Sequence, residues 1–123
     1  MKKILIVEGL CQWNAHLEEL LTDEGYQVLT TRALMSVRQL VVDEQPDLVL
    51  IGLGVRPPYG WHLFRQLKNF DVDLPVLVYQ ATHERAVHDI QQAVRVALRE
   101  VQSKNSAQRY AVRHWLRPMQ AVV

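Results

Sequence analysis

The chain has 123 residues, a formal net charge of +1 and one cysteine; 49% of its residues are hydrophobic and 22% are charged. These values are typical of one soluble globular domain, and they exclude wholesale disorder and an internal disulfide. The sequence contains no run of about 20 apolar residues, the length that spans a bilayer. The apolar stretch after Met1 ends at Glu8, too early for a signal peptide. We therefore expect a cytoplasmic protein without a membrane partner.

The first predicted strand is Lys3–Val7, a short apolar run rich in β-branched residues and typical of a strand buried on both faces. Apolar residues then recur at helical spacing as far as Gly25, a residue that favours the end of a helix. This helix face contains Leu10, Trp13, Leu17, Leu20 and Leu21. A second strand is predicted at Tyr26–Thr30. The helix after it must end before Pro46, and its apolar face contains Leu34, Val37, Leu40 and Val41.

Leu48–Leu53 has the strongest strand signal, because it is apolar throughout apart from Gly52. The turn-rich segment Arg56–Gly60 follows, and then a short helix is predicted. The residues expected to point inward from this helix are Trp61, Phe64 and Leu67. Pro75 opens a fourth strand, Val76–Tyr79. The resulting βαβαβαβ order predicts a parallel sheet with helices on both faces.

A long amphipathic helix of about five turns is predicted next. Its apolar residues are Ala86, Val87, Ile90, Ala93, Val94, Ala97, Leu98 and Val101. Tyr110–Leu116 fits either a fifth strand or a short helix, and periodicity does not separate the two. We therefore predict a single domain over residues 1–123. Residues 1–81 form regular βα units, and residues 82–123 form the long helix and an atypical C-terminal segment.

Charge divides the chain in the same place. Up to Glu84 there are 7 Lys/Arg and 11 Asp/Glu residues, whereas from Arg85 onward there are 7 and 2. A basic segment can mark a surface for nucleic acid or for an acidic partner, although an ordinary solvated helix face is the interpretation we favour. The candidate basic patch contains Arg95, Arg99, Lys104, Arg109 and Arg113, with Arg117 at its end. No helix-turn-helix signature or paired aromatic platform accompanies these residues, so nucleic acid is the weaker hypothesis.

Four sequence blocks, in order and at fitting distances, resemble a response-regulator receiver domain as far as about residue 81. The blocks are Lys3–Glu8, Glu24–Val28, Pro46–Ile51 with Gly60 after it, and Pro75–Val78. The resemblance implies a doubly wound, flavodoxin-like (CheY-like) α/β fold, here with a modified C-terminal third. It also implies a site outside the carboxyl ends of the strands.

In that family, a histidine kinase transfers a phosphoryl group to an aspartate at the end of the third strand, with Mg²⁺ held by that aspartate and an acidic pair. The corresponding positions here are Glu8 and Gly9 for the pair, Gly52 for the acceptor, Gln80 for a hydroxyl, Arg117 for a lysine and His114 for a switch aromatic. Gly52 offers no nucleophile, and one carboxylate of three remains to hold Mg²⁺. The resemblance therefore implies a degenerate pseudo-receiver without aspartyl phosphorylation at this site, and we expect no metal, no cofactor and no enzymatic activity.

Other residue combinations give weaker signals. Glu8 is interpreted as a structural carboxylate, with an ion pair to Arg117 as a specific hypothesis. Cys11 and His16 are five residues apart and do not share a helix face well, so a packed cysteine is favoured over a thiolate–imidazole pair. Glu84 and His88, with His83 adjacent, supply too few ligands for a zinc site. The three tryptophans, Trp13, Trp61 and Trp115, are expected in the core or as caps, although Trp115 is also a candidate interface anchor.

The function that these observations favour is a phosphorylation-independent protein-interaction module of two-component (phosphorelay) signalling. Its partner would be a signalling kinase or regulator, or a second copy of the chain in a homodimer. The candidate interaction face contains Val87, Ile90, Val94, Leu98 and Trp115. The alternative is a nucleic-acid-binding or adaptor protein that uses the basic C-terminal segment on a receiver scaffold.

Overall fold

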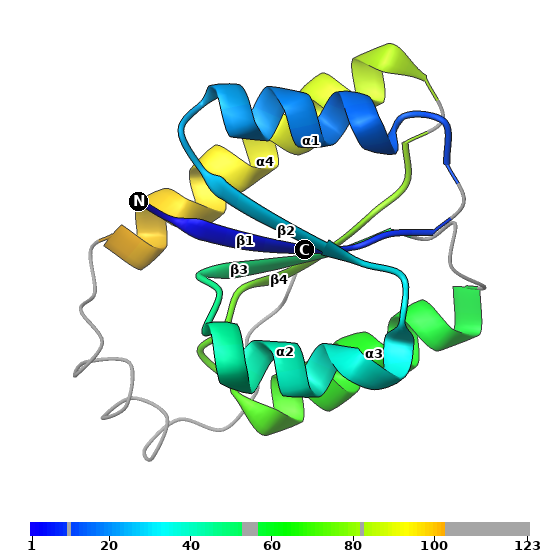
Figure 1. Ribbon diagram of the computed structural model, residues 1–123, viewed down its shortest axis with the longest axis vertical. Coiled ribbons are helices and arrows are strands. Elements are labelled where there is room, and N and C mark those ends of the chain that lie inside the picture. The colour runs from blue at the N-terminus through cyan, green and yellow to red at the C-terminus, as the bar shows by residue number, and fades with distance from the viewer. Residues whose placement is uncertain (10, 53–56, 82, 103–123) are drawn as a thin grey trace.

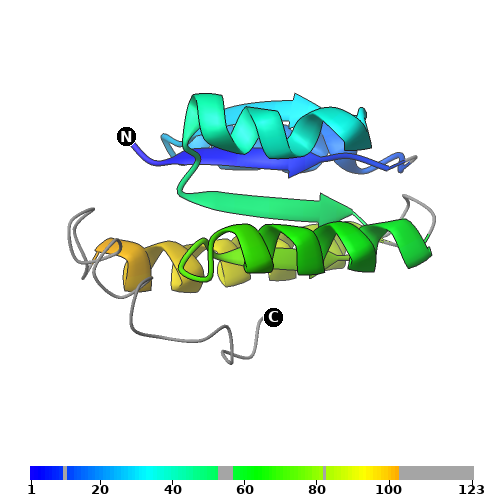
Figure 2. The ribbon, with the colours of Figure 1, turned by 90° about the horizontal axis from the view of Figure 1, so that it is seen from below.

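A computed structural model describes residues 1–9, 11–52, 57–81 and 83–102. Its strands are β1 (Lys3–Val7), β2 (Gln27–Thr31), β3 (Leu48–Gly52) and β4 (Val76–Tyr79). Its helices are α1 (Asn14–Asp23), the 3₁₀ turn η1 (Leu34–Ser36), α2 (Val37–Glu44), α3 (Pro57–Phe70) and α4 (Glu84–Gln102). The four strands form one parallel sheet in the order β2-β1-β3-β4. The arrows in Figure 2 point the same way, so the carboxyl ends of the strands lie along one edge of the sheet.

This architecture confirms the predicted α/β class, a flavodoxin-like (CheY-like) receiver fold. The predicted bounds of β1 and β4 are correct, and β2 begins one residue later than expected. The third strand is predicted at Leu48–Leu53. In the structure β3 ends at Gly52, and Leu53 lies outside the described residues. Gly25 has a φ of +95°, the left-handed conformation that lets the chain leave α1 for β2.

The two faces of the sheet have separate hydrophobic cores because side chains alternate along each strand. Ile4 and Ile6 of β1 point toward α1 and α4, whereas Leu5 and Val7 point toward α2 and α3. β3 divides its side chains in the same way, and all five of its residues are buried. Figure 1 shows α1 and α4 on one side of the sheet and α2 and α3 on the other.

Helix α3 differs from its prediction in length and in one inward residue. It begins at Pro57, inside the segment predicted as a turn, because proline is well suited to the first position of a helix. Leu63 and Leu67 are buried as its core residues. Trp61 is 48% exposed, contrary to prediction, and its ring packs nearly perpendicular to that of the half-buried Phe64, with 5.8 Å between the ring centroids. The inward face is centred on the Leu63–Leu67 repeat, which leaves Trp61 at the rim.

Helix α4 confirms the predicted long helix and covers the face of the sheet that α1 also covers (Figure 1). In the sheet, β2 lies on one side of β1, and β4 lies on the opposite side of β3. Because crossover connections are right-handed, α1 (between β1 and β2) and α3 (between β3 and β4) therefore lie on opposite faces of the sheet. Tyr110–Leu116, for which the sequence allows either a fifth strand or a short helix, lie outside the described residues.

Among the described residues, no helix combines the length and apolar character needed to cross a bilayer.

Candidate functional site at the carboxyl ends of the strands

Three residues of the candidate site follow or end neighbouring strands. Glu8 comes directly after β1, Gly52 ends β3, and Tyr79 ends β4. Gly52 and Tyr79 are partners in the β3–β4 register, and β1 lies on the other side of β3. Ligands of open α/β sheets bind outside the carboxyl ends of the strands, so this edge is where a binding or catalytic site is expected.

The Tyr79 side chain covers Gly52. A Cβ atom built on Gly52 would lie 3.1 Å from the Tyr79 Oη atom, 3.2 Å from its Cζ atom and 3.4 Å from the Gly9 backbone nitrogen. The two contacts with Tyr79 are tighter than ordinary van der Waals packing. A side chain at position 52 would therefore need the phenol of the neighbouring strand to shift by a few tenths of an ångström.

The Tyr79 hydroxyl is itself in an unusual environment. The side chain is 8% exposed, and the hydroxyl has no hydrogen-bond partner within the described ranges. Burial, followed by the nearby Glu8, Cys11 and Glu18 side chains, raises the pKa of Tyr79 above its ordinary value. The phenol thus stays protonated and neutral, and it can donate a proton to an acceptor rather than attack as an anion.

Glu8 is 7% exposed, and its surroundings favour the protonated form. Burial of the carboxyl group, together with a hydrogen bond and charge repulsion from Glu18, raises the pKa of Glu8 to about 7. Arg32 acts in the opposite direction, with its Nε atom 3.9 Å from Glu8 Oε1. Near neutral pH, Glu8 is therefore charged in only part of the molecules.

Arg32 is the described ion-pair partner of Glu8, and the sequence analysis did not identify it. It comes directly after β2, and β2 and β1 run parallel side by side, so the residues that follow them meet at one edge. The Glu8 backbone N–H also donates to the Thr31 carbonyl oxygen at 2.8 Å. Arg117, which the sequence analysis proposed as the partner, lies outside the described residues.

The turn after β1 is held by Asn14. Its side-chain amide is buried and donates to the Gly9 carbonyl oxygen at 2.7 Å. Gln80, the residue at the position of the family's hydroxyl, is exposed directly after Tyr79. The switch position His114 lies outside the described residues, as does Trp115.

The residues at this edge do not fit the Mg²⁺ ion that a receiver fold implies. Mg²⁺ demands near-ideal octahedral oxygen ligation and loses its water reluctantly. Of the three carboxylate positions that the resemblance implies, two are glycines, Gly9 and Gly52, and the third is Glu8, which is partly protonated near pH 7. The Tyr79 phenol also lies close to Gly52.

The candidate interaction face requires a correction. Val87, Ile90, Val94 and Leu98 are at most 8% exposed and pack against Ile4, Ile6 and Leu50 of the sheet and Leu17 and Leu21 of α1. They are core residues of this domain and do not form an outer surface. The amphipathic pattern correctly indicated that this face is buried. The sheet and α1 of the same chain cover it, whereas the prediction expected a partner protein there.

Two members of the candidate basic patch are described, and both are exposed residues of α4. Arg95 forms an ion pair with Glu24, and the Gln91 side-chain amide donates to the same carboxylate oxygen at 2.6 Å. Arg95 is therefore already engaged with an acidic group of its own domain. Lys104, Arg109 and Arg113 lie outside the described residues.

The remaining candidates have local partners. Cys11 is half-buried, and its Sγ atom donates to the Ala81 carbonyl oxygen and accepts from the Trp13 backbone N–H. Trp13 is half-buried against the core, as predicted. His16 of α1 lies close to Glu84 and His88 of α4, a contact that the sequence analysis did not predict.

No protein-family model matches the chain. Over 81 residues, 66% of its length, the chain is 32% identical to the virulence transcriptional regulatory protein PhoP of Salmonella choleraesuis and to PhoP of Salmonella typhimurium LT2. It is 29% identical over 79 residues to the transcriptional regulatory protein PhoP of Escherichia coli O6:H1. The matched segment spans 36% of the length of the Salmonella proteins and 35% of the E. coli protein. The N-terminal two thirds of the chain is thus distantly homologous to the response regulator PhoP, in agreement with its receiver fold.

Proposed function

We propose that this chain is a receiver domain of two-component signalling that transmits information by protein contact, without phosphorylation at the end of β3. The fold and the homology to PhoP support the receiver part of this proposal. The observation that supports the rest is the contact between Gly52 and Tyr79. In place of an acceptor carboxylate, the end of β3 has a backbone-only residue covered by a neutral phenol.

The chemistry of phosphoryl transfer gives the physical reason. The acceptor of a receiver domain presents a carboxylate oxygen to the phosphorus atom, and cations neutralise the transferred group. The one remaining carboxylate, Glu8, pairs with Arg32 and has a pKa of about 7. In this proposal the Glu8, Arg32 and Tyr79 side chains at this edge act as structural residues.

Contact with a partner protein is then the remaining way to transmit information. We propose a signalling kinase or regulator, or a second copy of the chain, as the partner. Because the apolar face of α4 is buried in the domain, this contact must use other surfaces than Val87, Ile90, Val94 and Leu98.

The experiment is sedimentation velocity of the full chain over a range of concentrations, before and after incubation with acetyl phosphate and Mg²⁺. We expect the same distribution of species in both samples, because the phosphodonor has no acceptor at the end of β3. A shift in the association equilibrium after the phosphodonor, reversed when the phosphoryl group hydrolyses, would contradict the proposal.

A further inference from the structure

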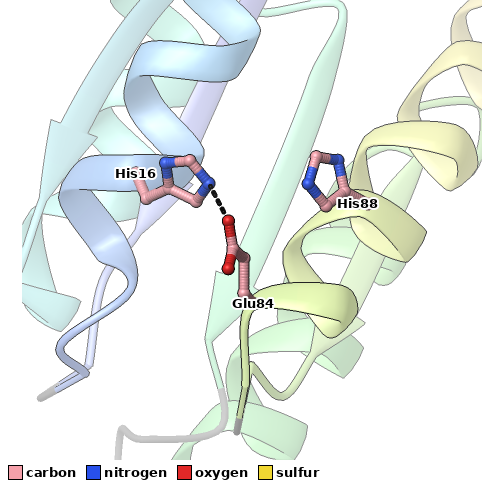
Figure 3. Close-up of side chains that lie close together, drawn as sticks. All are labelled: His16, Glu84 and His88. Atoms are coloured by element: carbon pink, nitrogen blue, oxygen red, sulfur yellow. Dashed lines mark ion pairs between the residues drawn. The ribbon is translucent and has the colours of Figure 1, made fainter.

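Three side chains with metal-binding atoms meet between α1 and α4. Glu84 and His88 are one turn apart at the start of α4, so they lie on the same side of that helix. His16 is the third residue of α1 and points toward them (Figure 3). One ligand atom from each of the three residues lies within 4.8 Å of the other two.

The His16 imidazole directs its Nε2 atom toward the Glu84 carboxylate. Its Nε2 atom is shielded from solvent, has no hydrogen-bond partner among the described residues, and lies 3.9 Å from Glu84 Oε1. The His16 and His88 rings are 6.2 Å apart between centroids and nearly perpendicular, on either side of the carboxylate (Figure 3). A cation placed midway between this shielded nitrogen and the carboxylate oxygen would lie about 2 Å from each, which is the distance of a zinc ligand.

We propose that His16, Glu84 and His88 bind a divalent transition-metal ion, with Zn²⁺ as the best fit. Two imidazoles and one carboxylate are a common protein ligand set for zinc, and a water molecule completes the tetrahedron. Ligand atoms about 2.1 Å from the ion are roughly 3.4 Å from one another in that geometry. The side chains of Glu84 and His88 are exposed and free to close the remaining difference by rotation.

The neighbouring candidates are engaged elsewhere. His83 uses its Nδ1 atom to accept the Ala86 backbone N–H at 3.1 Å, which caps the start of α4. The Cys11 thiol contacts Ala81 and Trp13. The proposed site is therefore one of nitrogen and oxygen ligands, without a thiolate.

The ion would link α1 to α4 near the N-terminal ends of the two helices. At the other end, Glu24 beyond α1 already binds Arg95 and Gln91 of α4. Because α4 covers one of the two hydrophobic cores, an ion held by both helices stabilises the whole domain. This inference goes beyond the proposed function and does not depend on it, since none of the three ligands belongs to the candidate site at the strand ends.

The test is calorimetric titration of the full chain with Zn²⁺, together with thermal unfolding at increasing Zn²⁺ concentration. We expect one ion per chain and a Tm that rises with the free ion concentration. His16→Gln, Glu84→Gln and His88→Gln should each weaken binding on the order of tenfold or more and reduce the Tm shift. His88 and Glu84 are exposed, so these two variants keep the test valid if His16→Gln fails to fold.

Two other histidine variants serve as matched controls. His62 is exposed on α3, on the opposite face of the sheet, and His83 is the neighbour of Glu84 along the chain. His62→Gln and His83→Gln should bind Zn²⁺ as the unmodified chain does. The proposal is overturned if Zn²⁺ does not bind, if one ion binds per two chains, if His88→Gln and Glu84→Gln keep full affinity, or if His83→Gln weakens binding equally.

Discussion

Gly52 and Tyr79 are partners in the register of β3 and β4, and the Tyr79 hydroxyl lies 3.1 Å from the position of a Gly52 Cβ atom. The two residues thus fit each other: the missing side chain of one makes room for the phenol of the other. The effect of a substitution at one position on the free energy of unfolding should therefore depend on the residue at the other position.

We expect Gly52→Ala to destabilise the domain by about 1 kcal/mol, because the added methyl group forces the phenol to move within a packed site. The free energy of unfolding in urea measures this cost. The same substitution in a Tyr79→Phe background should cost less, by about 0.5 kcal/mol, since the closest atom has been removed. An equal cost in both backgrounds would show that the two side chains are not in the contact described here.

Tyr79→Phe alone should leave stability unchanged or raise it by up to about 1 kcal/mol. The hydroxyl is buried without a hydrogen-bond partner in the described part of the chain, and such a group costs desolvation free energy that phenylalanine avoids. Urea unfolding again provides the measurement. A loss of more than about 1 kcal/mol would mean that the hydroxyl makes a stabilising hydrogen bond.

The raised pKa of Glu8 should make the stability of the domain depend on pH. Its pKa is about 7 in the folded chain and 4.5 in a model peptide, so the folded state binds more protons between these values. The contribution of Glu8 to stability is therefore fully present below pH 4.5 and is lost as the pH rises through 7. Relative to the unmodified chain, Glu8→Gln should gain on the order of 1–2 kcal/mol of stability between pH 5 and pH 8.

Urea unfolding of both proteins at a series of pH values measures this difference. Glu19→Gln is the matched control, because Glu19 is exposed on α1 beside Glu18. Its stability difference from the unmodified chain should stay constant over the same range. If Glu8→Gln also gives a constant difference, the pKa of Glu8 is not raised.

Helix α4 offers a matched pair of substitutions that separates core from surface. Val94 is fully buried, whereas Val96, two residues later, is 53% exposed. Val94→Asp should destabilise the domain by about 4 kcal/mol or more, because it buries an unpaired charge. Val96→Asp should change stability by about 0.5 kcal/mol or less. A folded Val94→Asp protein whose stability is unchanged would contradict the position of α4.

The sequence predicted the strands well because each is a continuous apolar run, and a strand buried on both faces leaves that clear signal. It did not predict which face of the sheet α4 covers. Helical periodicity reports that Val87, Ile90, Val94 and Leu98 share a buried face, but not what covers them. For this reason the sequence analysis wrongly predicted these residues as a surface for a partner protein.

The candidate site was predictable at the positions fixed by strand ends, Glu8 and Gly52. The contacts of Arg32, Tyr79 and His16 were not, because they join residues distant in sequence. Arg32 and Tyr79 could have been found from the parallel strand order, which brings the residues at the ends of β2 and β4 to the same edge. His16 depends on the packing of α1 beside α4, which no pattern along the chain encodes.

The central claim is that the end of β3 accepts no phosphoryl group, and intact mass spectrometry after incubation with acetyl phosphate and Mg²⁺ tests it most directly. We expect the unmodified chain to keep its mass. Gly52→Asp should also remain unlabelled, because Tyr79 crowds the new carboxylate and Gly9 still supplies no carboxylate for the cation. A stoichiometric phosphoryl adduct on the unmodified chain, mapped to the residues that follow β1 or β3, would contradict the account.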